Sequence, residues 1–96
     1  MEIICRIVKQ LPLQEREFDN RQTGQREKFA SMGFVLQSGS DRLYAEMLQE
    51  QARRQATLDY NHLYKACLKP GVHTWTDQGG QERYETRVTL QSITLM

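Results

Sequence analysis

The sequence predicts a mainly β fold: a small five-stranded barrel with one short helix between the third and fourth strands. Two observations lead to this prediction. Five segments are rich in β-branched or regularly alternating residues, as strands are. The composition that favours a helix occurs between the third and the fourth of these segments. A chain of 96 residues has room for one domain, which we expect to span residues 1–96.

The N-terminal part supplies the first two strands. Residues 3–9 (IICRIVK) are rich in β-branched residues and form the first expected strand. The polar stretch 13–28 contains turn-forming residues such as Thr23-Gly24 and indicates a long hairpin loop, with strand extensions at its ends as an option. Residues 29–37 (FASMGFVLQ) form the second strand, in which Gly33 indicates a bulge or a bend.

The segment that follows the tight turn at 38–40 admits two interpretations. Apolar and polar residues alternate over 41–48, which predicts a third strand. Residues 49–58 are rich in helix-favouring types and predict a short helix. The alternative is a single helix over 41–57.

The C-terminal part predicts two more strands joined by a hairpin turn. Residues 60–69 have strand character and continue, after an interruption at Pro70-Gly71, through 72–75. A Gly-containing turn at 77–80 reverses the chain. The alternation over 83–95 predicts a half-buried strand with one solvated face. This order of strands and helix is the topology of the OB-fold, a small Greek-key barrel.

The composition, with 39% hydrophobic and 26% charged residues, is that of a soluble globular protein. No apolar run approaches the roughly 20 residues of a membrane span, and the N-terminus lacks a signal pattern, so we expect a cytoplasmic location. The formal net charge is +1. A protein that held DNA through its phosphates alone would be more basic. If nucleic acid is the ligand, base contacts must supply part of the affinity.

Neither catalytic nor metal chemistry has support in the sequence. Cys5 and Cys67 lie far apart in strand-like segments and are expected to be reduced core residues. Two histidines without a Cys-x-x-Cys spacing do not make a zinc site. His62 and His73 have no nucleophile partner by spacing, and no Gly-rich phosphate-binding loop is present. We therefore expect a protein that is not an enzyme and uses no cofactor, metal or small-molecule substrate.

The single tryptophan, Trp75, stands between threonines just before the Gly-containing turn. An OB-fold binds ligands across its second and third strands, flanked by the loops that join strands one and two and strands four and five. Trp75 lies at the second of these loops, where its ring can stack on an unpaired base or pack across the hairpin. Tyr44 shares a face of the third strand with Arg42 and is expected to be exposed.

Residues 75–88 (WTDQGGQERYETRV) resemble the hairpin between the fourth and fifth strands of bacterial single-stranded-DNA-binding proteins. The pattern of that family is Trp, a polar residue, Asp, a Gly-containing turn and then Arg-Tyr-x-Thr-x-Val. Every one of these positions is filled here at matching spacing. The resemblance covers roughly the last third of the chain, and the rest agrees in strand order. Because the sequence ends at Leu95-Met96 without the acidic C-terminal tail of the family, it resembles a short, diverged relative.

The resemblance implies an OB-fold protein that binds single-stranded DNA without sequence preference in replication, recombination or repair, as a homodimer or homotetramer. The hairpin Trp of the family stacks on bases, which implies the same role for Trp75. The Arg-Tyr pair falls on Arg83 and Tyr84, which implies a phosphate contact and packing at the barrel rim. Basic residues in or beside the first loop, Arg16 among them, could together follow a nucleic-acid backbone. The expected nucleic-acid-binding residues are Trp75, Tyr44, Arg83, Arg42, Arg21, Arg26 and Lys28.

A function of another class remains open: an OB-fold module that binds another protein and no nucleic acid. The near-neutral charge suits this alternative, whereas the Trp75 hairpin favours DNA binding. Self-association is expected to use a strand at the edge of the sheet. The expected edge is the first strand, in which Ile4 and Val8 share a face with Arg6.

Overall fold

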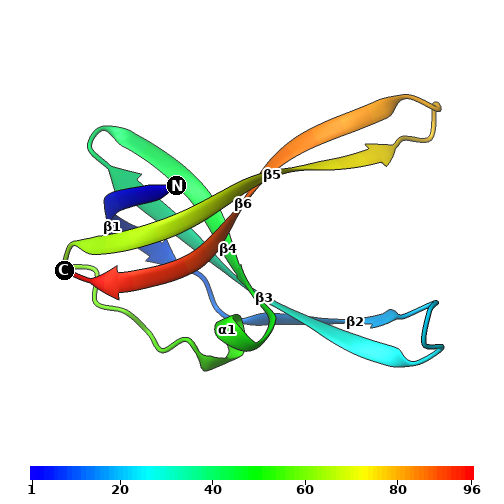
Figure 1. Cartoon of the computed structure of the whole chain (residues 1–96), viewed down its shortest axis with the longest axis horizontal. Coiled ribbons are helices and arrows are strands. Elements are labelled where there is room, and N and C mark those ends of the chain that lie inside the picture. The colour runs from blue at the N-terminus through cyan, green and yellow to red at the C-terminus, as the bar shows by residue number, and fades with distance from the viewer.

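The computed structural model covers all 96 residues and contains six strands and one helix. Figure 1 shows a closed sheet at one end of the molecule and two β-hairpins that project from it on the same side. The radius of gyration, 15.6 Å, exceeds the roughly 12.5 Å expected for a compact domain of this length, because the hairpins extend away from the core. The elements are β1 (Glu2–Gln10), β2 (Gln14–Asp19), β3 (Arg26–Ser38), β4 (Asp41–Leu48), α1 (Gln49–Arg54), β5 (Tyr64–Thr76) and β6 (Glu82–Leu95).

The sheet closes on itself through β1. This strand pairs with β5 along Glu2–Cys5 and with β3 along Arg6–Gln10, and the ring runs in the order β1-β5-β6-β4-β3. All pairings are antiparallel except that of β4 with β6, which is parallel. The expectation that the first strand forms the edge was wrong, because its two halves are paired with different neighbours. The outer edge of the sheet is β2, which pairs with β3 alone.

The core fills the closed end of the sheet and takes alternate residues from the strands. On β4, Ala45 and Met47 are fully buried, whereas Tyr44 and Glu46 point to the outside. Residues 41–48 are therefore a strand, and the alternative of one helix over 41–57 is excluded. The core residues are Cys5, Ile7, Met32, Phe34, Leu36, Ala45, Met47, Ala52, Tyr64, Ala66, Leu68 and Leu90.

The helix α1 is shorter than expected, ending at Arg54 instead of Leu58. The amide of Gln10 explains the difference, because it binds backbone groups that a longer helix would use. Its Oε1 accepts the N–H of Leu58 at 2.8 Å, and its Nε2 donates to the carbonyl of Ala56 at 3.1 Å. The chain is already extended at Gln55 (φ −74°, ψ 120°). No helix of the structure is long and apolar enough to cross a membrane.

The β2–β3 hairpin replaces the long loop expected over residues 13–28. Six residues of β2 pair continuously with β3, from Gln14 opposite Ser31 to Asp19 opposite Arg26. The turn closes where the N–H of Asn20 donates to the carbonyl of Gln25 at 2.9 Å. Gly24 takes a φ of 69° within this turn, a conformation that glycine adopts without steric cost. The strand extensions thus account for most of the stretch, and only the turn is a loop.

The β5–β6 hairpin differs from expectation at both of its strands. The interruption expected at Pro70-Gly71 is absent, since both residues pair with β6. Proline is tolerated because β1 accompanies β5 only as far as Cys67, so the missing N–H removes no bond to β1. On β6, residues 82–87 are exposed on both faces, and only Leu90 is fully buried. The expected half-buried strand over 83–95 is therefore confined to the part that lies against the core.

The two cysteines are free thiols in different surroundings. Cys5 belongs to the core, and burial raises the pKa of its thiol. Cys67 is half-buried, with its Sγ 3.5 Å from Oε1 of Gln91. Only Cys5 is thus a core residue in the expected sense.

Candidate nucleic-acid interface

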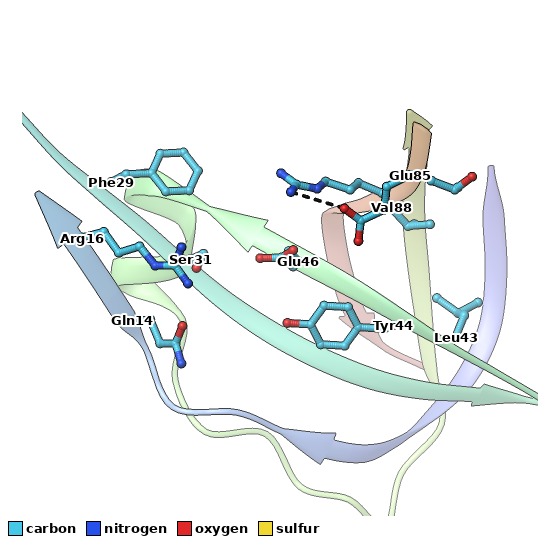
Figure 2. Close-up of a pocket in the computed structure, with 11 residues that line it drawn as sticks. Gln14, Arg16, Phe29, Ser31, Leu43, Tyr44, Glu46, Glu85 and Val88 are labelled. Carbon is cyan, nitrogen blue, oxygen red and sulfur yellow. Dashed lines mark hydrogen bonds and ion pairs between the residues drawn. The ribbon is translucent and has the colours of Figure 1, made fainter. Parts of the chain in front are cut away.

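A groove of about 570 Å³ lies between the two hairpins, over the outer face of β4. Figure 2 shows Tyr44 and Glu46 on β4, with Arg16 and Phe29 reaching in from the β2–β3 side and Glu85 from the β6 side. Most of its lining residues are polar or charged, as expected for a binding surface and not for a small-molecule cavity. The lining residues are Gln14, Arg16, Phe29, Ser31, Leu43, Tyr44, Glu46, Glu85, Thr86, Arg87 and Val88.

Tyr44 lies against the backbone of Gly33 on the neighbouring strand. A Cβ atom at position 33 would collide with the hydroxyl and the ring of Tyr44 and would lie 2.8 Å from Cδ1 of Leu11. Of the bulge or bend expected at Gly33, the bulge is absent, because Gly33 pairs regularly with Glu46. The missing side chain of Gly33 makes room for the ring. The pKa of Tyr44 is raised, first by burial and then by the charge of Glu46. The ring, 48% exposed, is a neutral aromatic surface at the floor of the groove.

One face of the β2–β3 hairpin presents aromatic and basic side chains toward the groove. Arg16 is the partner of Phe29, and Phe18 is the partner of Glu27, two positions further along the ladder. Directly paired residues of an antiparallel ladder share a face. Phe18 and Phe29 are 41% and 36% exposed, and Arg16 forms no ion pair. The hairpin therefore offers two accessible rings and a free guanidinium on one side.

The β5–β6 hairpin continues the groove on the opposite side. Arg87 and Glu85 line the groove and form an ion pair of 3.5 Å. Further out on the same face of the hairpin, Trp75 is the partner of Arg83 and is 43% exposed. Its ring is stacked on that of His73, with a centroid distance of 5.5 Å and an interplanar angle of 25°. Trp75 does not line the groove itself, but it lies on the face that does.

The turn that precedes Arg83 is organised by the carboxylate of Asp77. Its Oδ1 accepts the N–H groups of Gly79 and Gln81 at 2.9 and 3.0 Å, and its Oδ2 accepts Nε of Arg83 at 2.9 Å. The bond from Gln81, then the Arg83 guanidinium and then the bond from Gly79 hold the pKa of Asp77 below its ordinary value. The carboxylate thus fixes both the turn and the guanidinium opposite Trp75.

Arg53 of α1 fixes the base of the β2–β3 hairpin. Its Nε donates to Glu15 at 3.1 Å, its Nη1 to Glu50 at 2.7 Å, and its Nη2 to the carbonyl of Lys28 at 3.4 Å. The hydrogen bonds with Glu15 and then with Glu50 raise the pKa of Arg53. These contacts join α1 to β2 and β3 where the hairpin leaves the closed sheet.

The structure brings some of the expected binding residues together. Tyr44 lines the groove, and Trp75 and Arg83 lie on the groove-facing side of the β5–β6 hairpin. Arg42 shares the outer face of β4 with Tyr44 but lies beyond the groove, where its Nε donates to Oε1 of Gln37 at 3.2 Å.

The other expected residues lie on the β2–β3 hairpin away from the groove. Arg21 is in the turn. Arg26 and Lys28 alternate with Phe29 along β3, so they belong to the opposite face of the hairpin. On that face Arg26 forms an ion pair of 3.0 Å with Glu17.

Of the lining residues, only Tyr44 belonged to the expected binding set, and Arg16 was considered with the first loop. The aromatic and charged residues that sequence reasoning missed are Phe29, Glu46, Glu85 and Arg87. A signal for Phe29 was present in the alternation of β3. Met32 and Phe34 belong to the core, so the odd-numbered positions of this strand face outward. The groove holds two arginines, Arg16 and Arg87, and two glutamates, Glu46 and Glu85, so its formal charges cancel.

Comparison with solved structures identifies the architecture. The chain is similar to the second OB-fold domain of replication protein A from Methanococcus maripaludis, with a TM-score of 0.58 over 99% of this chain and 81% of that one. The fold is an OB-fold. At 13% sequence identity the likeness is one of fold. No protein-family model and no curated protein matches the sequence.

The elements that form the groove correspond to defined strands and connections of the OB-fold. The strands β3 and β4 are the second and third strands of the OB-fold, and β5 and β6 are its fourth and fifth. The β2–β3 and β5–β6 hairpins occupy the two connections that flank the binding face in OB-folds. The groove thus lies where OB-folds bind oligonucleotides and oligosaccharides.

Proposed function

We propose that this protein binds single-stranded DNA independently of sequence, by base stacking and backbone contacts, in replication, recombination or repair. The observation that carries the proposal is that accessible aromatic rings are distributed over the binding face of the OB-fold and over both of the hairpins that flank it. Tyr44 forms the floor, Phe29 and Phe18 lie on one hairpin, and Trp75 lies on the other. Every base has a π face, so such rings bind single strands without reading their sequence.

The proposed roles of the charged residues follow from their positions. Arg83 contacts phosphate beside Trp75, and Arg16 offers hydrogen-bond donors beside Phe29. Arg42, Arg21, Arg26 and Lys28 supply outer contacts to a strand that extends beyond the groove. Because the groove itself holds balanced charges, stacking contributes more than charge, at about 1–3 kcal/mol per base.

The finer part of the proposal is a relationship to the bacterial single-stranded-DNA-binding proteins. Its support is the hairpin pattern over residues 75–88, in which Trp75 and Arg83 are cross-strand partners and Asp77 holds the turn. These contacts give the Trp, Asp and Arg of the pattern a shared structural purpose. They keep the aromatic ring and the guanidinium together on one face of the hairpin.

Titration with oligo-dT tests DNA binding, with intrinsic fluorescence as the readout. Trp75 is the only tryptophan, so quenching reports directly on the β5–β6 hairpin. We expect quenching that saturates at a defined ratio of nucleotide to protein. The absence of both quenching and a gel shift at low salt would reject DNA binding and favour the protein-interaction module.

Self-association into a dimer or tetramer is the remaining part of the proposal. The free edge of the sheet is β2, and its charged sequence QEREFD disfavours unspecific pairing. Light scattering at micromolar concentration is expected to return a multiple of 11.3 kDa. A mass of one chain would exclude self-association without affecting the DNA-binding proposal.

A further inference from the structure

Glu46 is an unpaired carboxylate at the centre of the groove. It is half-buried, lines the groove together with Tyr44, and takes part in no ion pair. The other groove carboxylate, that of Glu85, is bound by Arg87 at 3.5 Å. Figure 2 shows the Glu46 side chain directed into the space between Arg16 and Glu85. A ligand that enters the groove therefore meets one carboxylate whose hydrogen-bonding capacity is unused.

This carboxylate restricts how a nucleic acid can lie in the groove. A phosphate placed against Glu46 would be repelled, and the cost is larger at a half-buried carboxylate than in bulk solvent. An ionised carboxylate accepts hydrogen bonds and donates none. The group that best fits the position is a base edge that offers N–H donors, so the strand must turn a base toward Glu46 and its phosphates away.

The four bases differ in the donors that an unpaired edge offers. Guanine presents a ring N–H and an amino group side by side, which matches the two oxygens of a carboxylate. Thymine presents one N–H between two carbonyl oxygens, which the carboxylate repels. Adenine and cytosine present one amino group next to a ring nitrogen that accepts. Among the DNA bases, guanine alone can satisfy both oxygens of Glu46.

The neighbouring side chains complete a site for one base. Tyr44 is two residues from Glu46 on the same face of β4, about 6.6 Å along the strand, so a base that stacks on its ring brings an edge to the carboxylate. Arg16 lines the same groove and forms no ion pair, which leaves its N–H groups free for the guanine carbonyl oxygen. The site therefore offers a stacking surface, a double acceptor and a donor.

We propose that Glu46 confers a preference for guanine at the nucleotide that stacks on Tyr44. This inference rests on the proposed DNA binding and limits its sequence independence at one position. The other stacking surfaces, Trp75, Phe18 and Phe29, remain indifferent to the base.

Competition binding with short oligonucleotides tests the preference. The probes are thymine oligomers of one length in which the central base is guanine, inosine, adenine, cytosine or thymine. A bidentate contact discriminates between bases by about five- to hundredfold, and we expect the guanine oligomer to bind tighter than the thymine oligomer by such a factor. Inosine lacks the amino group and is expected to fall between them.

The Glu46→Gln variant separates the carboxylate from the rest of the groove. Glutamine keeps the size of the side chain but offers one acceptor oxygen, so the ratio of guanine to thymine affinity is expected to fall close to one. The matched control is Glu2→Gln, which makes the same change of charge at a residue paired with Lys65 outside the groove. This control is expected to keep the wild-type ratio.

The outcomes distinguish this inference from the proposed function. Equal affinity of the wild-type protein for all five oligomers would overturn the guanine preference and leave DNA binding intact. A preference that survives in Glu46→Gln would overturn the role of the carboxylate. A protein that binds none of the oligomers would overturn both proposals.

Discussion

The strands β3 and β6 each run from the closed end of the sheet into a projecting hairpin, and the burial of their side chains differs between the two parts. On β3, Met32 and Phe34 are buried in the core, whereas Lys28 and Phe29 on the hairpin are exposed. On β6, Leu90 is fully buried, and every residue of 82–87 is exposed. A core demands apolar side chains on one face, but a hairpin in solvent demands none. Aromatic residues on the hairpins are therefore not explained by core packing.

The largest contrast is expected from stability measurements. Phe34 is fully buried, so Phe34→Ala should lower the free energy of unfolding by about 3–5 kcal/mol because it leaves a cavity. Trp75→Ala removes a half-exposed ring and its stacking on His73, which contributes about 0.5–1.5 kcal/mol. Urea denaturation followed by circular dichroism measures both. Equal losses would show that the hairpin is as much a part of the folding core as β3.

For DNA binding, the hairpin is expected to matter more than the core. Trp75→Ala is expected to weaken oligo-dT binding by about 1–3 kcal/mol, measured by anisotropy of a labelled oligonucleotide because the variant has no tryptophan signal. The dependence of affinity on salt should not change, since the ring touches no phosphate. Trp75→Phe keeps a smaller ring and should bind with intermediate affinity. If a folded Trp75→Ala protein bound as tightly as the wild type, the tryptophan would be structural.

A smaller effect is expected for the charge next to the tryptophan. Arg83→Ala should reduce the slope of log affinity against log salt by about 0.7 for each phosphate that the guanidinium neutralises on a single strand. Arg83→Lys keeps the charge and should preserve most of the slope, which separates charge from the hydrogen bond to Asp77. An unchanged slope in Arg83→Ala would remove this residue from the binding surface.

The smallest effect is an acid-dependent loosening of the β5–β6 turn. The pKa of Asp77 is lowered in the folded protein, so its contribution to stability is present above the ordinary value of about 3.9 and is lost as the pH falls through the lowered pKa. The fluorescence of Trp75 is expected to change in that acid range and to be constant at higher pH. Asp77→Asn, which cannot titrate, should remove this change. A change that persists in Asp77→Asn belongs to other carboxylates.

The fold of the closed end could be predicted from the sequence because burial imposes alternation. The strand over 41–48 was recognisable from Ala45 and Met47, and the alternation of these buried positions outweighed a composition that also suits a helix. The end of α1 could not be predicted, since it depends on the side chain of Gln10, which is distant in the sequence. Propensity describes a local segment and contains no information on such a contact.

The groove was less predictable because it depends on register. Arg16 and Phe29 meet only because the hairpin turns between Asn20 and Gln25, and the stretch contains other turn-forming residues. A shift of one residue would move Arg16 to the opposite face of the hairpin. Tyr44 and Trp75 were foreseeable, since their exposure follows from alternation and from the turn beside them, whereas the role of Gly33 appears only when β3 and β4 are paired.

The closed sheet is expected to open most easily at the parallel junction of β4 with β6, which lies beneath the groove. The junction consists of the single partner pair Glu46–Thr89, whereas β1 shares four pairs with each of its neighbours. Parting these two strands breaks few backbone hydrogen bonds, so amide protons on either side should exchange with solvent sooner than those of β3. Glu46 and Val88 place the groove across this seam. Local opening of this junction would change the width of the groove without disturbing the pairings of β1 that close the sheet.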